Sequence, residues 1–111
     1  EILRRMTASA PTSRLLVFLT EDDRVGHRPT ANALLERARA LGLAGGTVWR
    51  GIEGFGRGGH LRAARLPDLA RGLPLVLEII DEEERVDDFV EVVRELAPGA
   101  LVTLEPVRRL G

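Results

Sequence analysis

The chain has 111 residues, with 16 Lys+Arg against 17 Asp+Glu, and it contains no cysteine. This length suits one domain with a single core, and a net charge of -1 provides no field that would gather nucleic acid or anionic lipid without specificity. The absence of cysteine excludes disulfides, thiolate nucleophiles and thiolate metal sites. All 16 basic residues are arginine, which excludes Schiff-base chemistry and any phosphate-binding lysine.

No apolar run approaches the roughly 20 residues that a membrane-spanning helix needs, and residues 1–13 lack the apolar middle of a signal peptide. We therefore expect a cytoplasmic protein. Thr7 to Ser13 are small and polar and show no apolar period. This composition predicts a flexible N-terminal arm over residues 1–13, followed by one domain over residues 14–111.

The first predicted elements are a strand, a helix and a second strand. Residues 14–20 form a short, almost unbroken apolar run, which is typical of a strand covered on at least one face. Pro29 suits the first turn of a helix, and Gly42 suits its C-terminal cap. The apolar residues between them share one helical face: Ala31, Leu34, Ala38 and Leu41. The second strand is predicted over residues 47–53, where an internal glycine indicates a bulge or a close backbone neighbour.

The second half of the chain repeats this pattern after a long loop. Residues 54–73 show no period apart from a helical turn around residues 67–71, and a loop of this length is usually functional or disordered. Residues 75–80 predict a third strand, and Asp81 is expected to cap the helix that follows. The apolar face of that helix comprises Val86, Phe89, Val90, Val93 and Leu96. Pro98-Gly99 ends it, and residues 101–104 supply a fourth strand.

The resulting order, β-α-β-β-α-β, predicts an α+β fold of the ferredoxin-like type, in which two helices cover one face of a four-stranded antiparallel sheet. The first and third strands are apolar on both faces, so the second face of the sheet also needs a cover. Another copy of the same sheet is the simplest cover for so short a chain. We therefore expect a closed homo-oligomer.

The stretch from Arg50 to His60 holds five of the 12 glycines. Glycine lets a ligand approach the backbone closely, so that successive N–H groups can hold an anion, and Arg57, Arg62 and Arg65 add cations. A phosphate-binding loop and a hairpin whose glycines only permit turns explain this composition equally well.

Glu78 lies in the middle of an apolar strand, on the same face as Val76 and Ile80. A buried carboxylate needs a partner, whereas a carboxylate in a cleft between subunits is a candidate ligand contact. Both interpretations stay open on the sequence alone. Trp49 and Phe55 are interpreted as packing residues in preference to nucleobase stackers.

The two histidines and two C-terminal arginines complete the candidate residues. His27 and His60 lie 33 positions apart without a carboxylate at ligand spacing, so a metal site built from them would be under-coordinated. Either imidazole could serve as an acid or base, although neither stands in a nucleophile motif. Arg108 and Arg109 indicate a solvated tail, or one that folds over an adjacent anion.

Three segments of the sequence carry a resemblance to a known family. These are GTVWRGIEGFG at residues 46–56, LPLVLEIIDEEER at residues 73–85 and LVTLE at residues 101–105. Together with His27-Arg28-Pro29, they resemble the PII-like family known as a domain of unknown function, over about residues 14–109. That family is grouped with the PII (GlnB-like) signal proteins.

The resemblance implies a ferredoxin-like trimer with nucleotide sites in the clefts between subunits and a long T-loop that contacts partners. Thr47 and the segment Gly54, Phe55, Gly56 and Arg57 match the strand and the opening of the T-loop that contact adenine nucleotide in PII proteins. Glu78 matches an acidic strand position, while Arg108 and Arg109 match loosely the basic end that reaches phosphate.

The chain also departs from the PII pattern. Ala97-Pro98-Gly99-Ala100 stands where PII proteins have a phosphate loop rich in glycine and lysine. The lysine associated with 2-oxoglutarate has no counterpart, and the loop lacks the tyrosine that is uridylylated in some PII proteins. The resemblance therefore implies ADP or AMP as a ligand in preference to ATP, and no obligatory cofactor.

These observations predict a non-enzymatic signalling protein that binds an adenine nucleotide and regulates a partner protein through its T-loop. One alternative is a small nucleotide-acting enzyme that uses His60 or His27. Another is an interaction module without a small ligand, which would control a membrane transporter or channel.

Overall fold

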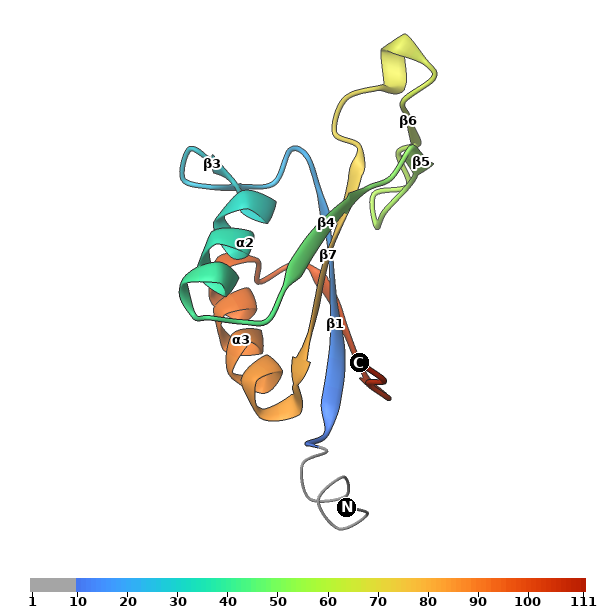
Figure 1. Ribbon diagram of the computed structural model, residues 1–111. Helices are drawn as coiled ribbons and strands as arrows, with labels where there is room; N and C mark the ends of the chain where they lie inside the picture. Colours follow the sequence, from blue (N-terminus) through green and yellow to red (C-terminus); the bar gives the residue numbers. More distant parts are fainter. Residues whose placement is uncertain (1–9) are drawn as a thin grey trace.

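The computed structural model describes residues 10–111 and consists of one main sheet, two helices and a projecting loop (Figure 1). The strands of the main sheet are β1 (Thr12–Thr20), β4 (Gly46–Arg50), β7 (Pro74–Glu82) and β8 (Leu101–Val107). The helices are α2 (Thr30–Ala40) and α3 (Glu83–Leu96).

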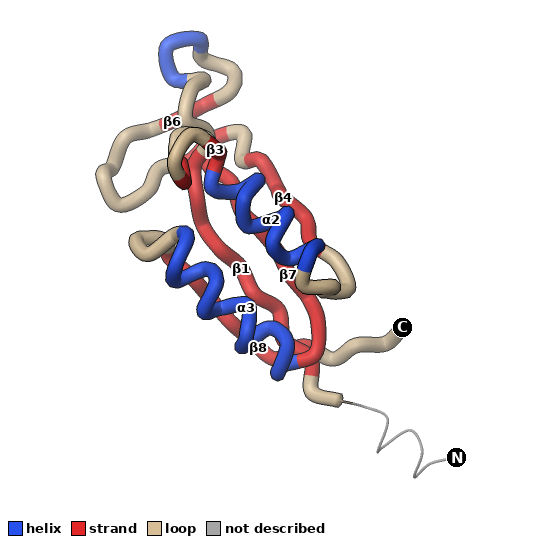
Figure 2. The backbone as a smooth tube through the Cα atoms, turned by 90° about the vertical axis from the view of Figure 1, so that its left-hand side faces the viewer, coloured by secondary structure: helices blue, strands red, loops and turns tan. Residues whose placement is uncertain are grey.

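The four strands lie in the order β4-β7-β1-β8, and every neighbouring pair is antiparallel. Figure 2 shows both helices on the same side of this sheet. The predicted ferredoxin-like α+β fold is therefore confirmed. Because β1 and β7 occupy the centre, the two strands with apolar residues on both faces are the two that the sheet pairs on both edges.

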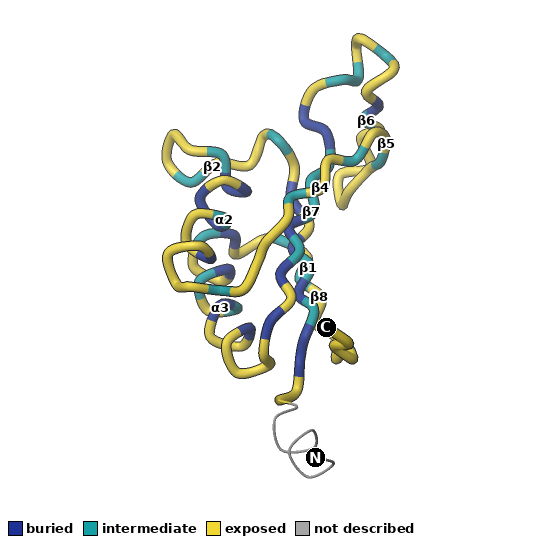
Figure 3. Tube along the Cα trace, viewed as in Figure 1, coloured by how far each residue is buried: buried dark blue, intermediate teal, exposed yellow. Residues whose placement is uncertain are grey.

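The core lies between the sheet and the helices. Alternate residues of the central strands point toward it, and Leu15, Val17, Leu77 and Ile79 are fully buried. Phe89 is the largest fully buried side chain, on the apolar face of α3 that the sequence predicts. Figure 3 shows the buried residues gathered where the helices meet the sheet.

The opposite face of the sheet, here called the open face, is covered by no helix of residues 10–111 (Figure 1). In the three rows that contain Arg14, Leu16 and Phe18, strand register places eleven side chains on it: Arg14, Leu16, Phe18, Thr47, Trp49, Val76, Glu78, Ile80, Leu101, Thr103 and Glu105. Six of these are apolar, and Phe18, Trp49, Ile80 and Leu101 are exposed. A contiguous exposed apolar area of this kind marks an interaction surface.

Element boundaries differ from the predictions at several places. The second strand, predicted over residues 47–53, spans Gly46–Arg50, and the fourth, predicted over residues 101–104, continues to Val107. β1 begins at Thr12, and Thr12 and Ser13 are buried, so the last two residues of the expected N-terminal arm belong to the sheet. Residues 1–9 of that arm lie outside the described residues. Pro29 precedes α2 at the N-cap position, and the cap of α3 is Glu82. The prediction that Asp81 caps α3 is therefore wrong, because β7 extends to Glu82 and keeps Asp81 in the strand.

Two small hairpins add to the predicted elements. β2 (Arg24–Val25) pairs with β3 (Arg28–Pro29) ahead of α2. In the long loop, β5 (Glu53–Gly54) pairs with β6 (Arg62–Ala63), and a 3-10 turn η1 (Pro67–Leu69) follows where the sequence predicts a helical turn. This region, the 51–72 loop, projects beyond the end of the sheet (Figure 1) and gives the molecule extents of 58 × 27 × 20 Å.

Candidate functional site

A pocket of about 330 Å³ lies at one end of the sheet, where β4 begins and β7 ends. We call it the edge pocket. It is lined by Thr12, Ala44, Gly45, Gly46, Thr47, Glu78, Ile80, Asp81 and Arg109. Three of the residues that the sequence singles out are among them, namely Thr47, Glu78 and Arg109.

One wall of the edge pocket is the connection between α2 and β4. α2 ends in a Schellman motif, in which Gly42 N–H donates to Arg39 and Leu43 N–H donates to Ala38. Gly42 has a φ of 75°, so the predicted glycine C-cap is confirmed. At the other end of the connection, a Cβ on Gly46 would lie 2.8 Å from Cδ1 of Ile79. The backbone of the wall therefore packs directly on β7.

Glu78 has a charged partner, and it also lines the edge pocket. Its Oε2 accepts a hydrogen bond from Nε of Arg14 at 2.6 Å, and its Oε1 accepts one from Nε1 of Trp49 at 3.4 Å. Arg14 also donates to Oε1 of Glu105 at 2.9 Å, and these hydrogen bonds to Glu78 and Glu105 raise the pKa of Arg14 above its ordinary value. Glu78 is thus an ion-paired residue of the open face that also lines the edge pocket.

Asp81 is the pocket residue that sequence reasoning misplaced. Its carboxylate is 4% exposed, and its oxygens accept hydrogen bonds from Ala44 N–H at 2.8 Å and Glu82 N–H at 2.7 Å. Burial by itself raises the pKa of Asp81, but these two hydrogen bonds and the charges of Arg85 and Arg109 outweigh burial and hold that pKa below its ordinary value. Asp81 is therefore anionic at neutral pH.

The second concave region, the distal groove, has a volume of about 790 Å³ and lies at the opposite end of the sheet. The opening of the 51–72 loop forms one wall, through Gly54, Phe55, Gly56 and Arg57. The end of β1, the start of β7, the turn at residues 22–24 and the connection from α3 to β8 complete it. Its lining includes three arginines and two aspartates, so the groove carries both signs of charge: Arg24, Arg57, Arg62, Asp22 and Asp23.

The base of the 51–72 loop is fixed to the sheet. Gly51 N–H donates to the carbonyl of Pro74 at 2.7 Å, and a Cβ on Gly51 would lie 2.6 Å from Cγ of Pro74. The close backbone neighbour predicted for this glycine is therefore Pro74. On the other side, Glu21 N–H donates to the carbonyl of Leu73, and Leu73 N–H donates to the Glu21 carboxylate, both at 3.0 Å.

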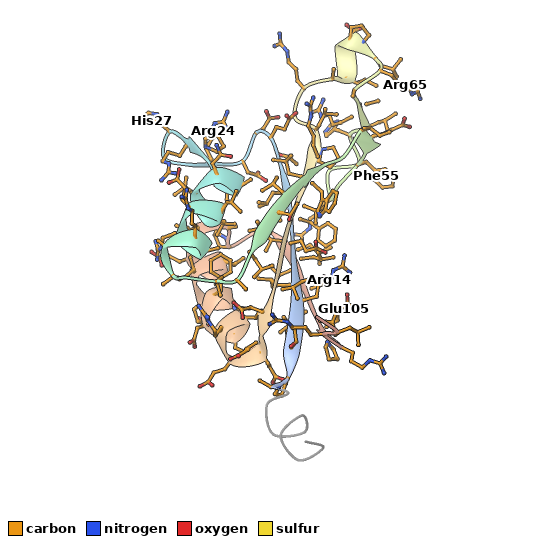
Figure 4. The ribbon with its side chains drawn as sticks, in the orientation of Figure 1. Arg14, Arg24, His27, Phe55, Arg65 and Glu105 are labelled. Atoms are coloured by element: carbon orange, nitrogen blue, oxygen red, sulfur yellow. The ribbon has the colours of Figure 1, made fainter. Side chains whose placement is uncertain are left out.

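The structure thus divides the predicted ligand residues between two places. Thr47, Glu78 and Arg109 line the edge pocket; Gly54, Phe55, Gly56 and Arg57 line the distal groove. Arg108 lines neither. In Figure 4, Phe55 lies near the loop end of the sheet and the Arg14–Glu105 pair lies toward the other end. Phe55 is 76% exposed, so the interpretation of it as a packing residue is not met within one chain.

The histidines do not form a common site. His60 lines the distal groove, while His27 lies in the turn between β2 and β3 (Figure 4) and does not line it. Within residues 10–111, no group of three or more His, Asp or Glu side chains is arranged to hold a metal ion. In the same part of the chain, no helix is both long and apolar enough to cross a membrane.

Solved structures of similar fold include signalling proteins. A candidate PII-like signalling protein from Thermus thermophilus gives a TM-score of 0.66 at 21% identity, with 91% of each chain covered. CPII from Thiomonas intermedia K12, a nitrogen regulatory PII-like protein bound to ADP, AMP and bicarbonate, gives 0.55 at 18% identity, with 91% of this chain and 94% of that chain covered. At these identities the likeness shows the fold alone.

Sequence relatives extend over almost the whole domain. The chain is 43% identical over 93 residues to a UPF0166 protein of Aquifex aeolicus (strain VF5), a match that covers 84% of this chain and 88% of that protein. The family DUF190, described as "Uncharacterized ACR, COG1993", matches residues 12–109. That range takes in all four main strands, both helices and both candidate pockets, and the chain belongs to the DUF190 family.

Proposed function

We propose that this protein is a PII-like regulator that binds ADP or AMP in clefts between copies of the chain and controls a partner protein through the 51–72 loop. The observation that carries the proposal is the division of its candidate ligand residues between two ends of one sheet, whose open face residues 10–111 leave exposed. Each chain offers two half-sites, and a neighbouring copy can bring the complementary halves together.

The open face supports self-association. It carries both apolar side chains and a cluster of charged ones. In that cluster the Arg14 guanidinium forms ion pairs with the carboxylates of Glu78 and Glu105. Burial of the apolar residues drives association, while a fixed pattern of charge sets register. We propose a homotrimer, the assembly that the resemblance to PII proteins implies.

The chemistry of the two half-sites favours a nucleotide. The edge pocket contains two carboxylates and one guanidinium, so a polyphosphate would be repelled from it, whereas a nucleoside offers N–H and O–H donors. The loop opening contributes glycine backbone and Arg57, groups that suit phosphate. The edge pocket lies at the small end of the roughly 300–1,000 Å³ typical of ligand sites. CPII, a protein of this fold, is bound to ADP and AMP.

The 51–72 loop is the proposed output. Nucleotide bound against Gly54–Arg57 would change the order of residues 57–71, the part that projects from the body (Figure 1). The partner is a regulated protein, with a membrane transporter or channel as one class to examine. The regulator itself is proposed to carry out no reaction and to need no cofactor.

Calorimetric titration of nucleotide-stripped protein with ATP, ADP, AMP and cyclic AMP, with and without Mg²⁺ and 2-oxoglutarate, tests the proposal. We expect saturable binding of AMP or ADP near one per chain and a trimer by light scattering. Absence of binding across the panel would overturn the nucleotide site. Conversion of the bound nucleotide during long incubation, lost in His60→Ala, would replace the regulator with the enzyme alternative.

A further inference from the structure

The wall of the edge pocket over residues 44–46 is almost entirely backbone. Gly45 and Gly46 carry no side chain, and a Cβ on Gly45 would meet nothing within 4 Å. Gly46 packs on the Ile79 side chain of β7, but no side chain packs against the Cβ position of Gly45. The position of the wall, and with it the shape of the pocket, depends on what holds the main chain between α2 and β4.

Two side chains from the end of β7 and the start of α3 hold it. Oδ2 of Asp81 accepts the N–H of Ala44 at 2.8 Å, and the guanidinium of Arg85 donates to the carbonyls of Leu41 at 3.3 Å and Gly42 at 2.5 Å. Arg85 also lies 3.8 Å from the Asp81 carboxylate. Donor and acceptor groups of the connection are thus held by one ion pair.

The Asp81 carboxylate is itself held in a fixed position, so it can hold the Ala44 N–H in place. Asp81 is buried, and it is held in β7 by pairing with β1 and by its own bond to Glu82 N–H. The charged groups that face it are Arg85 on α3 and Arg109 after β8. The connection at residues 41–46 contains no titratable residue, so Ala44 N–H is its only hydrogen-bond link to a carboxylate among the bonds of the described residues.

We infer that Asp81 is a positioning residue for ligand binding, which sets the backbone wall of the edge pocket through Ala44, with Arg85 as its partner. The inference rests on the proposed function for its ligand, but the hold on Ala44 itself does not. Asp81 would thus affect ligand affinity by holding the Ala44 backbone in the opposite wall of the edge pocket.

Hydrogen exchange and ligand affinity together test this role. In Asp81→Asn, the side-chain amide can satisfy only one of the two N–H donors and loses the attraction to Arg85. We expect the Ala44 amide to exchange at least about tenfold faster, and the dissociation constant for AMP to rise about tenfold. Arg85→Gln, which keeps the carboxylate, should give smaller changes in the same direction and serves if Asp81→Asn fails to fold. Asp88→Asn, on the exposed side of α3, is the matched control and should change neither quantity.

Each outcome decides a separate point. Unchanged exchange at Ala44 in both variants would overturn the hold on the wall. Faster exchange with unchanged AMP affinity would overturn the positioning role. If the unsubstituted protein binds no nucleotide, the proposed function fails, and the exchange measurement still decides whether Asp81 holds the wall.

Discussion

The two ends of the sheet are built in different ways. At the edge pocket, the wall is held by a Schellman motif, by strand pairing and by the Asp81–Arg85 ion pair. At the distal groove, the 51–72 loop is fixed only where it leaves and rejoins the sheet, and Phe55 and Ile52 are among the most exposed apolar residues of the described chain. The backbone of one end is held by contacts within the chain, while the other end presents apolar side chains that residues 10–111 leave exposed.

The two ends therefore differ in what their residues do: those at one end stabilise the fold, and those at the other are available to bind another molecule. Buried apolar contacts contribute most of the free energy of folding, and they are concentrated between the helices and the sheet. Exposed apolar groups on a loop contribute little until something covers them. Substitutions at the two ends should therefore affect different measurements.

A pair of phenylalanines offers the largest expected contrast. Phe89→Ala removes a fully buried ring from α3 and should lower the free energy of unfolding by about 3–5 kcal/mol. Phe55→Ala removes an exposed ring and should change it by less than about 0.5 kcal/mol. Urea denaturation followed by circular dichroism measures both. Similar losses in the two variants would show that the loop packs on the body of the protein.

A substitution on the open face should change the oligomeric state of the protein. Phe18 is 38% exposed on that face, in the central strand β1, so Phe18→Glu places a charge where a second copy is expected to pack. Light scattering should report a folded monomer in place of a trimer. Leu41→Glu adds the same charge at an exposed position at the end of α2, and it should leave the assembly intact. A trimer that persists in Phe18→Glu would contradict the assignment of the open face.

Substitution of a glycine in the loop opening should weaken nucleotide binding. A Cβ on Gly56 meets nothing within 4 Å, whereas one on Gly54 would lie 3.2 Å from Cγ of Pro74. Gly56→Val is therefore the cleaner probe, because its side chain adds no clash within the chain. We expect at least about tenfold weaker AMP binding with unchanged stability. Ala64→Val, in the same loop and exposed, is the control. Equal affinity in Gly56→Val and Ala64→Val would remove the loop opening from the site.

The smallest expected effect concerns acid stability. The pKa of Asp81 is lower in the folded protein than its ordinary value of 3.8. A group of this kind stabilises the fold above its unfolded pKa, and that contribution is lost as the pH falls through the folded pKa. Asp81→Asn should therefore be less stable near neutrality and should lose less stability on acidification below about pH 4. Parallel curves of stability against pH for the two proteins would refute the shift.

Regular elements were predictable because their signal is local. The apolar face of α3 and the apolar runs of β1 and β7 follow from periodicity, and Gly42 and Gly51 follow from backbone geometry. The β2–β3 hairpin was missed because its strands have two residues each, too few to show alternation. A glycine followed by histidine at its turn, with φ of 61° at Gly26, is the signal that could have indicated it.

Individual candidate residues could be named from the sequence, but which of them lie together in space could not. Arg14 was not a candidate, because its pairing with Glu78 and Glu105 depends on the register of three strands. Asp81 was placed at a helix cap because an acidic residue before an acidic run suits that position in the sequence. Only the extension of β7 by two residues turns its carboxylate toward Ala44.

We propose that a complete nucleotide site takes its edge pocket from one copy of the chain and its loop opening from another. Mixed assemblies of two inactive variants test it most directly: Arg109→Ala, which impairs the edge pocket, and Gly56→Val, which impairs the loop opening. We expect each variant alone to bind AMP weakly, and we expect refolding of the two together in equal amounts to restore about a quarter of the sites. Mixed trimers that bind no better than the separate variants would contradict it, since both halves would then have to belong to the same chain.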